Sequence, residues 1–130
     1  MDKFFDLFTF DGRANRAWYF WHIVLDDLVI FTLVMALGVL ATVLGSSVVV
    51  LLVPFFGALL GVSWAAIAIT VRRLHDLGRP GRHWWLLMVP LYNFYLGLVL
   101  LLQPGTPGPN RYGTDPLAAA RAPRYLGVGG

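Results

Sequence analysis

The residues best suited to chemistry lie in one polar segment, residues 72–83, between two long apolar stretches. It contains His75 directly before Asp76, and these residue types can form an acid–base pair. Adjacent side chains rarely point toward each other and no nucleophile accompanies them, so we predict no catalytic residues. The segment also contains four arginines, and guanidinium groups bind phosphate in a bidentate way. The chemistry that it favours is therefore recognition of phosphate groups.

Two more arginines precede the first apolar stretch, and we expect them to share one surface with the polar segment. The candidate residues for binding lipid phosphate or a partner are Arg13, Arg16, Arg72, Arg73, His75, Asp76 and Arg79. Because these charges adjoin apolar stretches, anionic membrane lipid is the expected partner, and a net charge of +3 does not argue for nucleic acid. The chain has no cysteine and its histidines lack a recognised metal-ligand spacing, so we predict no metal site and no cofactor.

The elements that must position these residues are three long apolar runs. They cover about residues 18–44, 48–71 and 84–102, and roughly 18 or more uncharged residues indicate a membrane span. We therefore predict an all-α membrane protein, a compact bundle of three transmembrane helices. An interfacial N-terminal segment and a short irregular C-terminal tail complete it. Residues 1–116 are expected to form one membrane domain and residues 117–130 a flexible tail.

The distribution of arginine and lysine predicts the orientation. Three spans place the N-terminal segment and residues 72–83 on the same side, which the positive-inside rule assigns to the cytoplasm. The tail then lies outside. In the alternative, the third segment breaks at Pro90 and re-enters, which brings the tail inside and lets all three polar motifs meet at one site.

Polar and small residues within the spans suggest contacts between the helices. At similar depths along the predicted spans we expect a buried polar layer of His22, Asp26, Ser63 and Asn93; alternatively, Asp26 and Asp27 lie at the level of the headgroups. A small-residue stripe formed by Gly57, Gly61 and Ala65 permits close helix packing, within one chain or between two copies.

Three motifs, taken together, resemble a known family. They are Phe10-Asp11-Gly12-Arg13-Ala14-Asn15-Arg16, then Arg72-Arg73-Leu74-His75-Asp76, and finally a tail motif from Gly105 to Pro116 that includes Asn110, Tyr112, Gly113 and Asp115. In this order they are similar to domain-of-unknown-function family 805. The resemblance implies a small bacterial inner-membrane protein of three or four spans with no established activity. The turn-rich tail motif could form a compact cap on the bundle.

These observations favour a non-enzymatic module that binds lipid or a partner through its basic polar segment. The second hypothesis is a subunit of an oligomeric transporter or channel, because three helices are too few to enclose a pore. The third and weakest is a lipid-modifying enzyme, which requires His75 and Asp76 to line one pocket.

Overall fold

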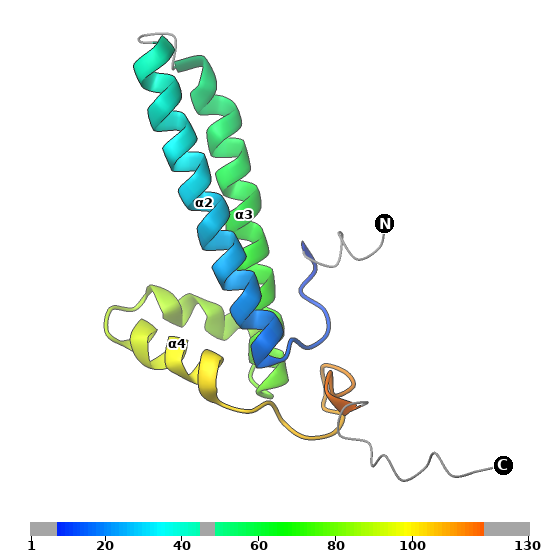
Figure 1. Ribbon diagram of the computed structural model, residues 1–130. Helices are drawn as coiled ribbons and strands as arrows, with labels where there is room; N and C mark the ends of the chain where they lie inside the picture. The colour runs from blue at the N-terminus through cyan, green and yellow to red at the C-terminus, as the bar shows by residue number, and fades with distance from the viewer. Residues whose placement is uncertain (1–7, 45–48, 119–130) are drawn as a thin grey trace, which may run out of the picture.

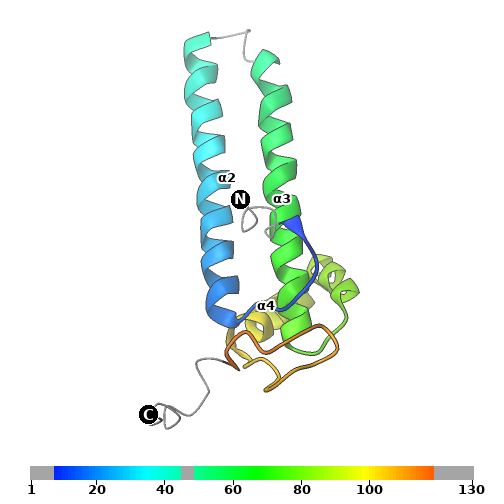
Figure 2. The ribbon, with the colours of Figure 1, turned by 90° about the vertical axis from the view of Figure 1, so that its right-hand side faces the viewer.

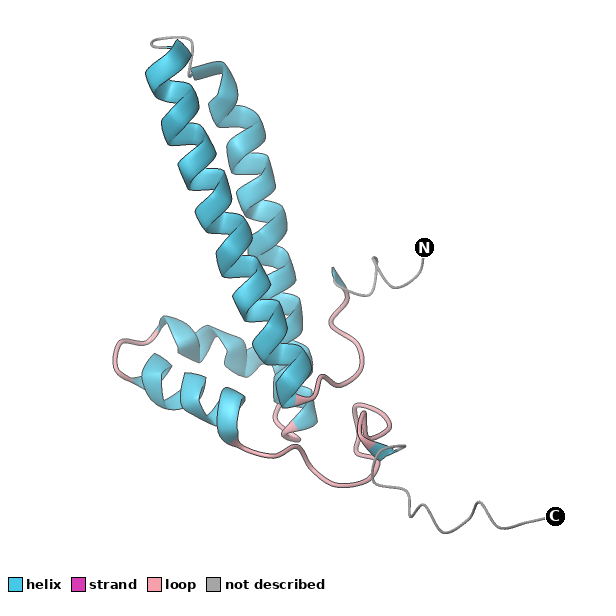
Figure 3. Ribbon diagram, in the orientation of Figure 1, coloured by secondary structure: helices cyan, strands magenta, loops and turns pink. Residues whose placement is uncertain are grey.

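In the computed structural model, residues 8–44 and 49–118 are described, and all their regular elements are helical (Figure 3). In chain order these are α2 (Arg16–Leu44), α3 (Val49–Asp76), the 3₁₀ helix η3 (Gly81–Met88) and α4 (Tyr92–Leu102). Within the described ranges the only β pairing is an isolated bridge between Asn110 and Gly113. The prediction of an all-α chain is confirmed.

Helices α2 and α3 form a long antiparallel hairpin (Figures 1 and 2). They contain 29 and 28 residues, which gives lengths of about 44 and 42 Å at 1.5 Å per residue. Both are long and apolar enough to cross a membrane, and the most apolar 18 residues of each are unburied. No residue from Leu28 to Val71 carries a charge. Because contact between so large an apolar surface and water is unfavourable, this surface suits contact with lipid. The short link between the first two predicted spans, residues 45–47, lies outside the described residues.

The polar ends of the hairpin have recognisable helix caps. The side chain of Asn15 accepts a hydrogen bond from the backbone N–H of Trp18 at 2.8 Å, which is an N-cap for α2. Helix α3 ends in a Schellman motif. There Gly78 has a φ of +71°, its N–H donates to the carbonyl of His75, and the N–H of Arg79 donates to the carbonyl of Leu74. Residues 72–76 of the polar segment therefore belong to α3, which extends beyond the predicted end of the second span at residue 71.

The third predicted span, residues 84–102, is not one continuous helix. It consists of the end of η3, a reversal at residues 89–91 and the 11-residue α4, which rises only about 17 Å. Pro90 cannot continue a helix because it lacks a backbone N–H, and Leu91 has a φ of +68°. The η3–α4 hairpin packs against one end of the long hairpin, formed by the start of α2 and the end of α3 (Figures 1 and 2). We call this end the base. The predicted bundle of three spans is therefore replaced by two long helices and a bent segment.

The core sits at this base and not along the length of the hairpin. Its fully buried residues include Leu74 of α3 and Leu96 and Leu100 of α4, and Tyr19 and Ala14 join them in one cluster. The long hairpin thus supplies apolar surface, whereas the base supplies the packed protein interior.

The predicted helix-packing glycines do not bring helices together. A Cβ added at Gly57 or Gly61 would meet no other heavy atom within 4 Å, and Ala65 is only half-buried. In this chain α2 therefore does not pack closely on that stripe. Association between copies through it stays a prediction.

The two flanking segments both lie at the base. The backbone N–H of Thr106 donates to the carbonyl of Asp76 at 2.8 Å, and the N–H of Ala14 donates to the carbonyl of Arg72 at 3.0 Å. Residues 104–118 therefore lie at the same end of the hairpin as residues 72–83, which agrees with the alternative of a break at Pro90; the side of the membrane on which the tail lies stays a prediction. The physical reason for this placement is the reversal at Pro90, which returns the chain to the end from which η3 began.

Single cysteines test this topology, because the natural chain has none. We expect Arg82→Cys and Thr114→Cys to react with a membrane-impermeant maleimide added to the same side of sealed vesicles. Val49→Cys, at the other end of the hairpin, serves as the opposite-side control. Labelling of Thr114→Cys together with Val49→Cys would mean that the third segment crosses the membrane.

Candidate functional site

The centre of the base is the carboxylate of Asp76, which is held between two arginines. Arg13 Nε donates to Asp76 Oδ1 at 3.0 Å, and Arg73 Nη1 donates to Asp76 Oδ2 at 2.5 Å. All three side chains are at most 3% exposed. We call Arg13, Asp76 and Arg73 the hub. Charges this deeply buried are tolerated only when they are paired and their hydrogen bonds are satisfied.

Arg73 links α3 to the end of α4. Its Nε donates to the carbonyl of Leu100 at 2.7 Å, and its Nη2 donates to the carbonyl of Gln103 at 2.5 Å. Carbonyls at a helix C-terminus lack partners within the helix and carry the negative end of its dipole. A guanidinium group satisfies both needs, so Arg73 fixes where α4 ends.

Arg13 links the N-terminal segment to the tail. Its Nη1 donates to the carbonyl of Gly108 at 2.6 Å, and its Nη2 donates to the carbonyl of Thr106 at 2.5 Å. These carbonyls are part-buried and belong to a loop, so no helix or sheet supplies their hydrogen bonds. Arg13 therefore holds an irregular stretch that could not otherwise be desolvated.

The tail from Pro104 to Ala118 forms a cap over the last turn of α3. The amide of Asn110 donates to the carbonyl of His75 at 2.9 Å. The ring of Tyr112 stacks on the His75 imidazole, with centroids 3.9 Å apart. The Arg111 guanidinium lies over the same Tyr112 ring, 4.6 Å from its centroid. The tail motif thus contacts the last turn of α3 through both a hydrogen bond and ring stacking.

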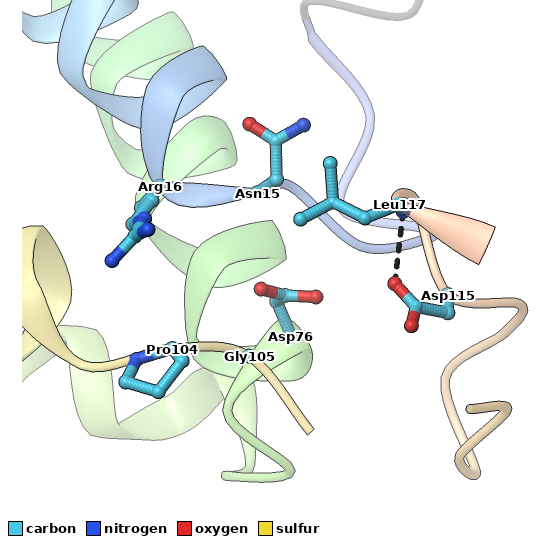
Figure 4. A pocket seen from close by; sticks show the side chains of 7 residues that line it. All are labelled: Asn15, Arg16, Asp76, Pro104, Gly105, Asp115 and Leu117. Carbon is cyan, nitrogen blue, oxygen red and sulfur yellow. Dashed lines mark hydrogen bonds between the residues drawn. The ribbon is translucent and has the colours of Figure 1, made fainter. Parts of the chain in front are cut away.

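A cavity of about 50 Å³ lies beside the hub, and Arg16, Asp76 and Asp115 are among the residues that line it (Figure 4). Asp115 shapes the tail, because its carboxylate accepts the backbone N–H groups of Gly108 and Leu117 at 3.2 and 2.8 Å. The volume is enough for a water molecule or two but not for an organic substrate. Among the described residues no three histidine, aspartate or glutamate side chains gather as a metal site would need.

The geometry does not favour acid–base catalysis by His75 and Asp76. His75 Nδ1 lies 3.2 Å from the carbonyl oxygen of Gly12, and its ring is covered by Tyr112. Asp76 is bound by both arginines and lines the cavity, but His75 does not line it. The two side chains therefore have separate structural partners.

The predicted phosphate-binding residues fall into two groups. Arg13, Arg73 and Asp76 are buried in the hub, so the prediction that they bind lipid at the surface is wrong. The reason is that their polar groups satisfy the carbonyls of chain segments that fold back onto α3. Arg16 is exposed, and Arg72, His75 and Arg79 are half-buried; lipid binding by these residues stays a prediction.

The predicted polar layer between the spans is not formed. Asp26 Oδ2 and Asn93 Oδ1 are buried without a hydrogen-bond partner, so they bond neither each other nor Ser63, which is exposed. His22 instead packs edge-on against Trp18, with ring centroids 4.6 Å apart. The layer fails because Asn93 lies at the start of α4, past the reversal, and not inside a third span.

Several residues of the site carry no ionisable group and were missed from the sequence. Thr106, Gly108, Leu100 and Gln103 contribute backbone carbonyls to the arginines, and Gly105 packs directly against Asp76. Thr106 and Gly108 stand in the tail motif on which the family resemblance is based, and that was the available signal.

Substitution of the central carboxylate should unfold the base. Asp76→Asn removes the charge that both buried arginines share, and breaking a buried ion pair on one side costs about 3–5 kcal/mol. Unfolding in mixed detergent, followed by tryptophan fluorescence, would measure this loss. Asp27→Asn removes the same charge from an exposed position and should change the free energy of unfolding by less than about 0.5 kcal/mol. Equal effects of the two variants would contradict the hub.

Gly105 provides a second test of the hub that leaves every charge in place. A Cβ at this position would collide with the Asp76 carboxylate, so Gly105→Ala should lower the free energy of unfolding by about 1–3 kcal/mol. Gly97→Ala is the matched control, since a Cβ there meets nothing within 4 Å. It should be neutral or slightly stabilising because alanine favours a helix. A harmless Gly105→Ala would mean that the tail does not pack on Asp76.

Comparison with known proteins finds relatives that align with most of the chain. The chain is 38% identical over 112 residues to "Inner membrane protein YhaH" of Escherichia coli (strain K12), covering 82% of this chain and 86% of that protein. It is 34% identical over 109 residues to "Inner membrane protein YhaI" of the same organism, covering 82% and 85%. No solved structure matches. These relatives and the two long apolar helices support an inner-membrane location.

The model of one family matches residues 7–114, which include the N-terminal motif, the hub and most of the tail motif. Its description is "Protein of unknown function (DUF805)". Because the match covers most of the chain and the resemblance from the three motifs points to the same family, the chain belongs to DUF805.

Proposed function

We propose that this protein is a non-enzymatic membrane module whose basic end binds the headgroups of anionic phospholipids. The observation that carries the proposal is the hub. It gathers the N-terminal segment, the end of α3 and the tail at one end of an apolar hairpin, and it leaves other arginines of that end outside the protein interior.

The hub also argues against an enzyme. It commits the carboxylate of Asp76 to two arginines, and the adjoining cavity of about 50 Å³ is far below the roughly 300–1,000 Å³ of small-molecule sites. A lipid-modifying enzyme would need its acid–base groups and its substrate in one pocket. A transporter or channel would need several copies, since two long helices enclose no pore.

The basic end consists of Arg16, Arg79 and Arg82, together with the half-buried Arg72. Arg16 and Arg82 are exposed and Arg79 is half-buried, and all lie at or next to the base of the hairpin. The far end of the described hairpin carries no charge. Under the positive-inside rule this asymmetry favours a cytoplasmic base, where the leaflet is rich in anionic lipid.

Tryptophan quenching by brominated lipid tests the proposal, because Trp84 and Trp85 directly follow the polar segment. In vesicles of phosphatidylcholine mixed with brominated phosphatidylglycerol, we expect stronger quenching than random mixing gives. The double variant Arg79→Gln with Arg82→Gln should weaken this preference by about 1 kcal/mol for each arginine. High salt should weaken it too, because exposed charges are screened.

Arg111→Gln is the matched control for loss of a positive charge. Arg111 lies over the ring of Tyr112 and is not assigned to the basic end, so its variant should keep the preference. Equal quenching by brominated phosphatidylglycerol and brominated phosphatidylcholine in the natural protein would refute lipid recognition by charge.

A further inference from the structure

An open apolar groove of about 420 Å³ lies between the start of α2 and the end of α4. Its lining residues are Arg16, Ala17, Phe20, Trp21, Leu101 and Leu102. Every one except Arg16 is apolar, and Arg16 stands at the helix end nearest the base. The groove therefore has a charged end and a hydrocarbon end, in the same order as a phospholipid in the surrounding leaflet.

We propose that this groove is a discrete site for one phospholipid, with its phosphate on Arg16 and an acyl chain along Phe20, Trp21 and Leu102. The inference deepens the proposed function and rests on it, because it assigns one specific lipid position within the basic end. It goes beyond a general preference for anionic lipid, which needs no groove.

Charge is the first argument for this occupant. Arg13 and Arg73 are buried and bonded to protein carbonyls and to Asp76, whereas Arg16 is exposed. Within the described residues no hydrogen bond or ion pair to the Arg16 side chain is found. In residues 8–44 and 49–118 this guanidinium group at the mouth of an apolar groove thus lacks a partner, and a lipid phosphate supplies a bidentate one.

Continuity with the hydrocarbon surface of α2 is the second argument. Trp21 and Leu102 are 60% and 67% exposed, so they extend the unburied apolar surface of the hairpin down to Arg16. Helix α4 ends there because Arg73 holds its last carbonyls, and this brings Leu101 and Leu102 alongside the first turns of α2. A second copy of the chain is a poorer occupant, since a two-fold contact would bring two unpaired Arg16 groups into one interface.

The test is native mass spectrometry of the detergent-solubilised protein titrated with phosphatidylglycerol. We expect one phospholipid per chain to be retained more tightly than all further ones. Arg16→Gln should weaken this first association by about tenfold, which is the effect of losing hydrogen bonds to a charged group. Arg111→Gln removes an equal charge away from the groove and should leave the first association unchanged.

Two variants test the hydrocarbon end separately. Ala17→Phe fills the groove and should weaken the first association although Arg16 is intact. If Ala17→Phe does not fold, Leu102→Gln replaces an exposed wall residue with a polar one and should act in the same direction. Inorganic phosphate at millimolar concentration should not displace the bound lipid, because it offers no acyl chain.

The following results would overturn the site. They are an unweakened first association in Arg16→Gln, full retention of lipid when the groove is filled or its wall is polar, and displacement by inorganic phosphate alone. Binding of a second protein chain in place of lipid would also overturn it. The brominated-lipid experiment uses Arg79 and Arg82 and leaves Arg16 intact, so failure of the groove is distinguishable from failure of the proposed function.

Discussion

The structure depends on the pairing of one buried carboxylate with two buried guanidinium groups. Asp76 carries one negative charge, and Arg13 and Arg73 carry two positive ones, so charge pairing alone does not account for the arrangement. Both arginines also donate to backbone carbonyls: Arg73 to those of Ala14, Leu100 and Gln103, and Arg13 to those of Thr106 and Gly108. Arginine suits this role because it offers five N–H donors in a fixed planar fork and stays protonated when buried.

The two arginines also supply hydrogen-bond donors that the backbone of the returning chain needs. The chain after α3 does not continue as one straight helix; it turns at Pro90 and returns to the base. The returning segments are short or irregular, so their carbonyls cannot all be satisfied within helices. Near a bilayer such groups need protein partners, because irregular backbone is tolerated at the membrane only when protein or water satisfies it. The hub supplies those partners and so makes a two-helix hairpin with a bent third segment possible.

The need to bond the returning chain also explains why the arginines have different roles. The position of each arginine in α3 or in the N-terminal segment decides whether its guanidinium group turns inward. Arg13 and Arg73 face the returning chain and become structural, whereas Arg16, the first residue of α2, is exposed. The arginines at this end of the hairpin therefore supply both the internal bonds of the base and the charges that remain for ligands outside it.

The sequence by itself determined the helical class, the two long apolar helices and the family. These follow from local properties: hydrophobic run length and motif order. Only the tertiary structure decided that the third apolar run bends, that the tail joins the base, and that Arg13, Arg73 and Asp76 are buried together. Arg13 and Asp76 are 63 residues apart, and the partners of both arginines are mostly backbone carbonyls, which every residue possesses. No residue type marks such a contact in advance, so its existence depends on where the reversal at Pro90 delivers the chain.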